Sequence, residues 1–337
     1  MGKRKEREDL EEQFRKNTPL LSGKPVNIEA KGTYLGEEIG LTVSESVTLT
    51  INKRIGLAKK AIFEIKFILE DCRSKIAGGL NTGLLIWESC IIPFILNNSS
   101  TWLDIKQKDI ERLVKLQNLF LSVLLGIQNC PAVMMYWDLA ILTIPNRILK
   151  NKLMFYHHIA NLPDHALCRK ILDTKVRLKL GGLHEEVRQF LARHQVIDIQ
   201  KFTKPEWKRF VDRKLNLENR EFLIQWSGKY KKVDSLSLAC EEYERKEYLN
   251  KLNLAQSRIK FRERSSCMTT CRTDYPSDPG NIKAVFECFH CEKLDVLSHW
   301  RECNAYAKFR ESKSLENDAD LVLYYQQIID FRRSELD

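Results

Sequence analysis

The chain has 337 residues, of which 43% are hydrophobic, and this is enough for a sizeable core and for two or three domains. Only 14 glycines and nine prolines occur, which favours long helices and argues against a turn-rich β architecture. Lys and Arg outnumber Asp and Glu by 55 to 45. The net charge of +10 favours nucleic acid or an acidic membrane surface as a partner, or else a solvated surface of mixed charge.

The first 29 residues are highly charged and then interrupted by proline and glycine, which predicts a charged lead-in over 1–29. They contain no apolar segment of the secretory type, so we expect an intracellular protein, in the nucleus or the cytoplasm. The most apolar stretch, 82–96, is shorter than a membrane span, and Glu88 and Pro93 interrupt it. We therefore expect no membrane partner, and ten cysteines that are thiols or metal ligands rather than disulfides.

Residues 30–49 place aromatic and β-branched side chains around three glycines, which predicts a short β-hairpin. Two helices are predicted within the helical region 50–130. The apolar positions of the first helix recur at alternating spacings of four and three: Ile51, Ile55, Ala58, Ile62, Ile65 and Leu69. The second runs from about Asp104, as N-cap, to Gly126, as stop. Its stripe is Ile110, Leu113, Val114, Gln117, Phe120, Leu121 and Leu124.

The second half of the chain continues as helical segments over 131–264, separated by proline and glycine breaks. A polar, irregular linker is predicted at 265–281, followed by a Cys/His cluster at 282–310. The last segment, 311–337, has the pattern of an amphipathic helix. Its apolar residues are Leu321, Leu323, Tyr324, Ile328, Ile329 and Phe331.

Four potential metal ligands follow the pattern Cys288-x2-Cys291-x7-His299-x3-Cys303. The Cys-x2-Cys arm can grip one ion from a tight turn, and the His-x3-Cys pair lies one helical turn apart. Three sulfurs and one imidazole form the closed tetrahedral set of a structural site for one zinc ion. His290, inside the first arm, is an alternative ligand, and four metal-free side chains in a cysteine-rich chain are the alternative without zinc. Two further cysteines, Cys267 and Cys271, have no second ligand pair nearby and are interpreted as plain thiols.

The segment 201–233 interleaves ten Lys or Arg and four acidic residues with aromatics. Basic side chains neutralise phosphates, and aromatic rings can stack on unpaired bases. The alternative is that the aromatics are the buried face of helices; Phe210, Leu217 and Ile224, spaced seven apart, fit a core stripe. The candidate nucleic-acid contacts of this segment are Lys208, Arg209, Trp226, Lys229, Tyr230, Lys231 and Lys232.

Several stretches, taken in order, resemble the C-terminal portion of the reverse transcriptases of non-LTR (LINE-like) retrotransposons. GTYLGEEIGLTV is similar to the primer-grip hairpin, and INKRIGLAKKAIFEI to the first thumb helix. Two stretches are similar to the later part of the thumb, namely LLIWESCIIPFILNNSSTWLDI and IERLVKLQNLFLSVLLGI. A third is similar to the connecting helices, namely MMYWDLAILTIPNRILKNKLMFYHHIANLP. CFHCEKLDVLSHWREC is similar to the family's Cys-Cys-His-Cys knuckle. Together these stretches cover roughly residues 30–335.

The resemblance implies a mainly α fold: a helical thumb and connection bundle with a short N-terminal β-hairpin and a small C-terminal zinc knuckle. It also implies RNA or DNA as partner, with phosphate contacts from the first thumb helix at Lys53, Arg54, Lys59 and Lys60. In the family, the catalytic aspartates lie in the palm, before the Tyr-Leu-Gly segment. Only 33 residues precede Tyr34, and no Asp-Asp pair occurs in the chain; YWDL at 136–139 has Leu139 in place of the second carboxylate.

We therefore expect no catalytic residues and no enzyme activity of this chain on its own. The predicted function is that of a reverse transcriptase fragment that binds template–primer or target DNA without polymerase chemistry. Two alternatives stay open. One is a retrotransposon-derived module with a structural zinc site that binds a protein partner. The other is a truncated gene model of an active RNA-directed DNA polymerase.

Overall fold

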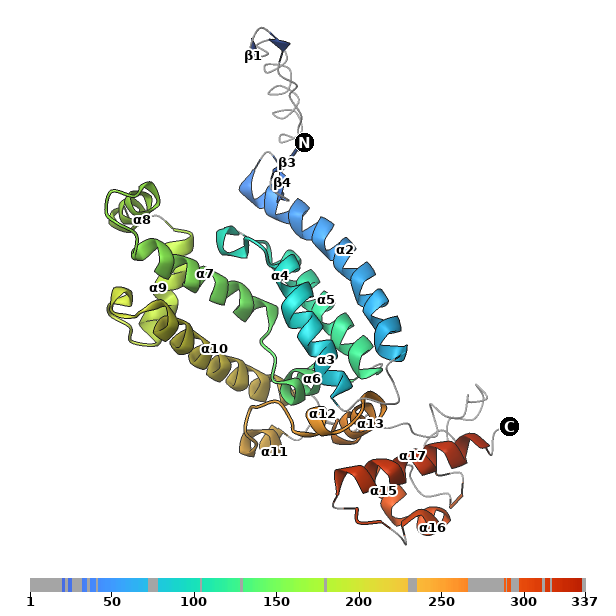
Figure 1. The fold of residues 1–337 in the computed structure, drawn as a ribbon. Coiled ribbons are helices and arrows are strands. Elements are labelled where there is room, and N and C mark those ends of the chain that lie inside the picture. The colour runs from blue at the N-terminus through green and yellow to red at the C-terminus, as the bar shows by residue number, and fades with distance from the viewer. Residues whose placement is uncertain are drawn as a thin grey trace.

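The structure is a computed structural model, and it confirms the predicted mainly α class (Figure 1). It describes residues 20–21, 24–25, 32–34, 37–40, 42–71, 78–103, 105–127, 130–178, 181–229, 235–265, 288, 290–291, 297–310, 313–315 and 317–334. Within these ranges the strands form two short antiparallel hairpins, and helices make up most of the rest.

Both hairpins precede the helical part of the chain. The first, β1 (Leu20–Leu21) with β2 (Lys24–Pro25), lies where only a charged lead-in was expected. The second, β3 (Gly32–Tyr34) with β4 (Glu37–Ile39), confirms the hairpin predicted within 30–49. The Glu38 backbone N–H donates to the Thr50 hydroxyl at 2.8 Å, which holds this hairpin against the helix that follows.

Two long helices form the centre of the first hydrophobic core, as the sequence predicts. In α2 (Val43–Asp71) the predicted stripe is buried from Ile51 to Ile65, while the side chain of Leu69 lies outside the described residues. The other helix, α5 (Gln107–Leu125), begins after the predicted N-cap, which is not among the described residues. It ends as predicted at Gly126, whose φ of 61° suits a residue without a side chain.

Short helices cover α2 and α5 and complete the first core. They are α3 (Gly79–Ile86), the π-turn η1 (Trp87–Ile91), α4 (Ile92–Ile95), the 3₁₀ turn η2 (Ser99–Thr101) and α6 (Ala132–Leu139). Trp87 is fully buried and stacks on Phe120 of α5, with 4.3 Å between ring centroids. This aromatic pair fixes the short helices on the long one.

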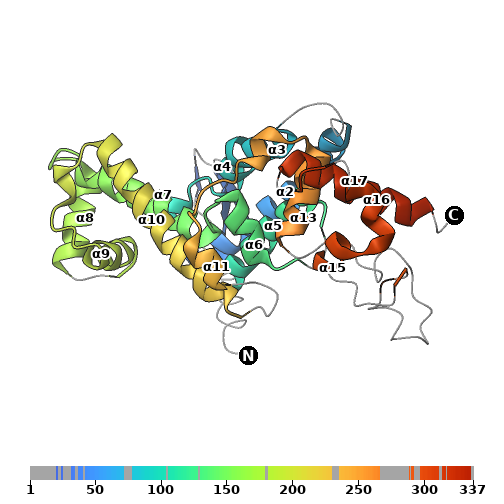
Figure 2. The ribbon, with the colours of Figure 1, turned by 90° about the horizontal axis from the view of Figure 1, so that it is seen from below.

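A second core lies within a lobe that we call the basic lobe, residues 144–229, for reasons of charge given below. Figure 2 shows this lobe extending away from the rest of the described chain. It consists of α7 (Ile144–Ala160), α8 (Leu167–Arg177), α9 (Leu183–Arg193), the 3₁₀ turn η3 (Ile199–Lys201) and α10 (Lys204–Ser227). The change from the first core to the second occurs within α7, between Ile148 and Leu153.

The buried side of α10 differs from the predicted stripe. Buried residues recur at every fourth position: Trp207, Val211, Leu215, Asn219, Leu223 and Ser227. Leu217, which the seven-residue spacing placed in the core, is 49% exposed, so that part of the prediction is wrong. A four-residue row runs obliquely around a helix, and the helices that contact α10 are α7, α6 and α11.

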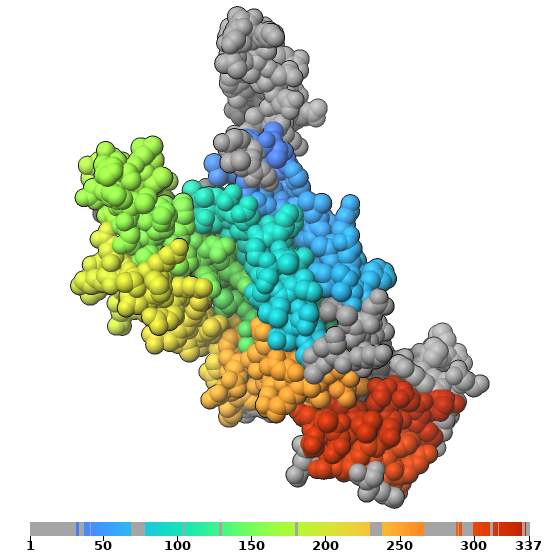
Figure 3. Space-filling model, in the orientation of Figure 1, coloured from blue at the N-terminus to red at the C-terminus, as the bar shows by residue number. Residues whose placement is uncertain are grey.

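The C-terminal helices lie below α3 and α6 (Figure 1), and the space-filling view in the same orientation shows α15 to α17 farthest from them (Figure 3). They are α11 (Ser235–Cys240), α12 (Tyr248–Lys251), α13 (Leu254–Arg264), α15 (Leu297–Glu302), the 3₁₀ turn η4 (Asn304–Tyr306), α16 (Ala307–Arg310) and α17 (Asp318–Ser334). The predicted apolar face of α17 is buried at Leu321, Tyr324 and Ile328 and packs against α13. Leu323, assigned to the same face, is 49% exposed.

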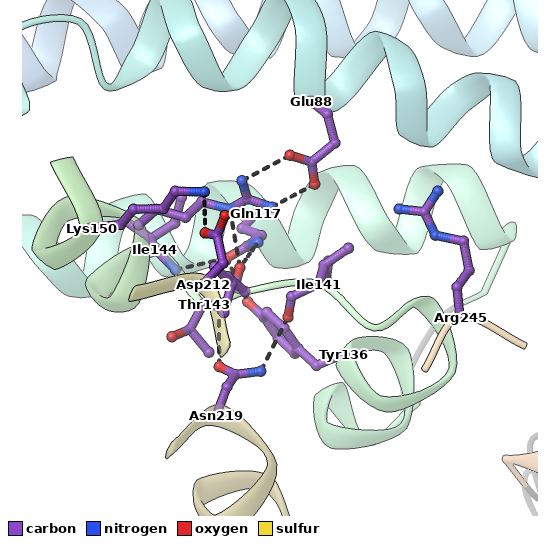
Figure 4. Close-up of polar contacts among 12 residues, drawn as sticks. Glu88, Gln117, Tyr136, Ile141, Thr143, Ile144, Lys150, Asp212, Asn219 and Arg245 are labelled. Carbon is purple, nitrogen blue, oxygen red and sulfur yellow. Dashed lines mark hydrogen bonds and ion pairs between the residues drawn. The ribbon is translucent and has the colours of Figure 1, made fainter. Parts of the chain in front are cut away.

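The passage from the first core to the basic lobe is held by two buried amides (Figure 4). Gln117 of α5 accepts the backbone N–H of Ile144 at 3.2 Å and donates to the carbonyl of Leu142 at 3.0 Å. From the opposite side, Asn219 of α10 accepts the N–H of Thr143 and donates to the carbonyl of Ile141, both at 3.3 Å. Both amide side chains are fully buried, so these bonds replace water for the peptide groups of residues 141–144.

We predict that replacing Gln117 with Leu lowers the free energy of unfolding by about 1–3 kcal/mol. Leucine is similar in size but leaves the buried N–H of Ile144 without a partner, and a buried unsatisfied group costs roughly 1–3 kcal/mol. The carbonyl of Leu142 keeps the Arg147 Nε–H, at 3.2 Å, as a donor. Urea unfolding followed by circular dichroism measures the change. Gln225→Leu, at an exposed position of α10, is the matched control and should stay within about 0.5 kcal/mol of the parent. Equal effects of the two substitutions would refute this role for Gln117.

Candidate metal centre and basic surface

The four predicted metal ligands lie together. One ligand atom from each of Cys288, Cys291, His299 and Cys303 lies within 4.8 Å of all the others, a group that could hold a metal ion. The Sγ of Cys303 is 4.0 Å from that of Cys288 and 3.8 Å from that of Cys291. These separations match the edge of a tetrahedron with metal–sulfur bonds of about 2.3 Å, which is about 3.8 Å. They are far longer than a disulfide bond of about 2.05 Å.

Local hydrogen bonds give both ligand pairs their spacing. The Cys291 N–H donates to the carbonyl of Cys288 at 3.2 Å, which closes the turn of the first pair. His299 lies on α15, and the Cys303 N–H donates to the His299 carbonyl at 2.8 Å, so the second pair spans one helical turn. The imidazole Nε2 of His299 is 3.2 Å from the Sγ of Cys291 and closes the ligand set.

The alternative ligand, His290, is not part of this group. Its ring packs against Tyr306 and Phe331, with centroid separations of 5.5 and 5.6 Å. Sequence spacing could not separate the two histidines because both are close to the cysteines in the chain. The structure separates them because α15 directs His299 toward the sulfurs, whereas His290 belongs to the aromatic packing of α17.

The cluster is anchored to the helices around it. The Tyr324 hydroxyl of α17 donates to the carbonyl of Trp300, which is buried beside the ligand His299. Arg310 donates to the carbonyls of Arg301 at 2.6 Å and Cys303 at 3.0 Å, where α15 ends. These bonds satisfy carbonyls that a helix end leaves without an intrahelical partner.

The thiols resist ionisation in the metal-free protein. The pKa of Cys288 is raised to about 12, chiefly by burial and to a smaller extent by the neighbouring Cys303 and Cys291. Burial also raises the pKa of the Cys303 thiol above its ordinary value. A metal cation bound among these sulfurs would lower both pKa values, because thiolate is the form that binds metal.

The basic residues predicted on α2 divide into two kinds. Lys59 and Lys60 are exposed, and Lys53 is half-exposed and pairs with Glu38 at 2.6 Å. Arg54 is only 5% exposed, and this burial corrects the prediction that its side chain contacts a phosphate. Its guanidinium pairs with Glu37 and donates to the carbonyls of Asn97 at 2.6 Å and Ile95 at 3.2 Å, so it is occupied in holding the hairpin and α4 to α2.

The candidates at 201–233 also divide. Lys208, Arg209 and Lys229 are exposed. Trp226 is half-buried, and its ring packs against those of Tyr136 and Phe222, with 6.2 and 5.6 Å between ring centroids. This packing covers part of the ring surface that could otherwise stack on a base. The remaining candidates lie outside the described residues, as do the two cysteines interpreted as plain thiols: Tyr230, Lys231, Lys232, Cys267 and Cys271.

The sequence prediction missed how strongly the positive charge is concentrated. Residues 144–229 contain 18 Lys or Arg and nine Asp or Glu, so this lobe carries +9 of the chain's +10. The signal is present in the sequence, but the lobe is recognised as a unit only in the structure, where α7 to α10 enclose the second hydrophobic core. On η3 and α10, five exposed basic side chains form no ion pair with another described residue: Lys201, Lys204, Lys208, Arg209 and Arg213.

Among the described residues, no helix has the length and apolar character needed to cross a membrane. Comparison with protein families, with characterised proteins and with solved structures finds no match.

We predict that the affinity of the cluster for a divalent metal falls steeply as the pH falls. Because the raised pKa of Cys288 and Cys303 keeps these thiols protonated at neutral pH, binding must release their protons. Each released proton weakens binding about tenfold per pH unit, so two or three protons give on the order of 100- to 1000-fold between pH 7.5 and 6.5. Competition with a chromophoric chelator measures this, and a pH-independent affinity would exclude thiolate ligation.

Proposed function

We propose that this chain binds nucleic acid through the basic lobe, as a non-catalytic fragment of the non-LTR reverse transcriptase type. The observation that carries the proposal is the charge: almost the whole net charge of the protein lies on one folded lobe of 86 residues. A solvated surface of mixed charge would spread its excess over the chain. A concentrated excess of cations is the electrostatic footprint of a phosphate-binding surface.

The helix α10 supplies the most regular part of this surface. Lys204 and Lys208 are four residues apart, and so are Arg209 and Arg213. A rise of 1.5 Å per residue therefore gives two neighbouring rows with about 6 Å between successive cations. That interval is close to the distance between successive phosphates of one strand. The exposed Lys59 and Lys60 of α2 are a proposed second contact.

The proposal contains no polymerase step. Asp138, the carboxylate in the half-motif YWDL, is fully buried. It accepts from the Arg264 guanidinium and the Tyr248 hydroxyl, each at 3.0 Å, and so joins α6 to α13 and α12. These contacts give the residue a structural role.

We further propose zinc as the metal of the Cys/His cluster. Soft thiolates and an imidazole in a tetrahedral arrangement select zinc or iron–sulfur chemistry, and a mononuclear set of three sulfurs and one nitrogen is typical of zinc. Four protein ligands fill the coordination sphere, so the ion would stabilise the fold of residues 288–303 and take no part in a reaction.

A protein partner is the second candidate function, and one observation on α8 favours it. Leu167, Ile171 and Leu178 lie on one side of this segment and are 71%, 48% and 57% exposed. Exposed apolar groups of this kind are common where proteins associate. Binding to such a surface would depend little on salt, whereas phosphate binding weakens steeply as salt rises.

We predict that removing two charges from α10 weakens nucleic-acid binding. The double substitution Lys208→Ala and Arg209→Ala should lower the slope of log K against log salt by about two, because each lost phosphate contact changes it by about one. Fluorescence anisotropy with a labelled RNA or DNA strand, at several salt concentrations, gives the slope. Lys106→Ala with Lys108→Ala, which removes the same charge from exposed positions at the start of α5, is the control and should leave the slope unchanged. Equal slopes for all three proteins would contradict the assignment of the surface to the basic lobe.

We predict one tetrahedral metal ion per chain, with zinc preferred. Cobalt(II) should produce the intense visible absorption of a tetrahedral thiolate complex, and one equivalent of zinc should abolish it. Cys303→Ser should weaken binding at least about 100-fold, because a hydroxyl does not replace a buried thiolate. Cys168→Ser, at an exposed thiol on α8, should bind as the parent does. A parent protein that retains cobalt when zinc is added would overturn the zinc assignment.

A further inference from the structure

A cleft of about 640 Å³ opens between α10 and the segment that follows α11. Arg213, Leu217 and Arg220 line the wall formed by α10, and Glu242 and Tyr243 line the opposite wall. Clefts of a few hundred Å³ with a few converging polar groups are the usual size of small-ligand sites. This one lies at the end of the cationic rows described above.

The α10 wall continues the basic surface into the cleft. Arg209, Arg213 and Arg220 fall on one side of the helix, since they are spaced by four and then seven residues. The Arg220 guanidinium donates to the carbonyl of Ala239 at 2.7 Å, which fixes its position while leaving other N–H groups of its fork available. Two guanidinium groups on one wall are suited to a phosphate, which they can bind through paired hydrogen bonds.

The opposite wall offers one carboxylate and one rigid ring. Glu241 is occupied by Lys246 at 2.7 Å and Arg264 at 2.9 Å, whereas Glu242 is exposed and forms no ion pair with a described residue. The Tyr243 hydroxyl donates to the carbonyl of Ile141 at 3.0 Å and accepts from Asn219 at 2.6 Å, so its ring is held in place.

We infer that this cleft binds one unpaired nucleotide of the bound strand, with a preference for guanine; the inference rests on the proposed nucleic-acid binding. The phosphate lies on Arg213 and Arg220, and the base lies between the exposed Leu217 and the ring of Tyr243. Glu242 reads the base edge. An ionised carboxylate only accepts hydrogen bonds, and guanine presents two adjacent donors, N1–H and N2–H, to its two oxygens. Uracil presents one donor between two acceptors and fits this carboxylate poorly.

The test compares a short labelled oligouridine with the same strand carrying one central guanosine, by fluorescence anisotropy on the full chain. The parent protein should bind the guanosine strand about tenfold more tightly, the size of a good paired contact to a base. Glu242→Gln should bring the two affinities to within about twofold, because glutamine offers one acceptor in place of two. Its affinity for oligouridine should not fall.

The matched control is Glu244→Gln, which removes the same charge from an exposed residue two positions away and should keep the guanosine preference. Circular dichroism confirms that both variants fold. Salt-sensitive binding of both strands with equal affinity, or a preference that survives Glu242→Gln, overturns the inference and leaves the proposed function standing. Absence of salt-sensitive binding to either strand overturns the proposed function and the inference together.

Discussion

The architecture depends on how residues 141–144 are held between two helices. A turn at this point would bury four peptide groups away from water, and each would cost free energy without a partner. Gln117 and Asn219 supply those partners from α5 and α10. Because α7 begins directly after this turn, its direction is set here, and the orientation of the basic lobe follows from it.

The helix α13 has a comparable role on the other side of the first core. Arg258 donates to the carbonyls of Val123 and Leu124, and Arg262 donates to that of Gly126, so α13 caps the end of α5. Two other charged residues of α13 pair with the helices around the Cys/His cluster: Glu263 with Arg301 of α15 and Lys260 with Asp318 of α17, both at 2.8 Å. Since α17 also packs on α13, the module that carries the metal ligands is joined to the same helix that closes the first core.

Sequence periodicity was sufficient to predict the buried side of a helix where one regular apolar stripe packs against one neighbouring element. The buried face of α2 and the stop at Gly126 depend on neighbours in the chain, and the structure confirms both. The four candidate ligands from Cys288 to Cys303 were also chosen by their spacing, and the structure brings them together in a group that could hold a metal ion. The burial of Arg54 was not predictable in this way, because its partners Glu37 and Asn97 come from separate elements.

The predicted apolar stripe of α10 was partly wrong for a different reason. Aromatic and aliphatic residues occupy so many of its positions that spacings of both four and seven fit the sequence, and only packing against α7 selects the first. The cleft beside α10 was likewise hidden from sequence analysis. Its walls come from segments about 25 residues apart, at Arg213–Arg220 and at Cys240–Tyr243, and neither carries a recognisable motif.

The four-residue spacing on α10 has a geometric consequence for any strand that follows this helix. Four residues turn an α-helix by about 40° more than one full revolution. From Trp207 to Ser227 the buried row therefore rotates about the axis by roughly 200° in five steps. The outward side rotates with it, so the surface that the first turns present points almost opposite to the one presented by the last. A strand that stayed on the outward side over the whole length of α10 would therefore wind around the helix as a partial spiral.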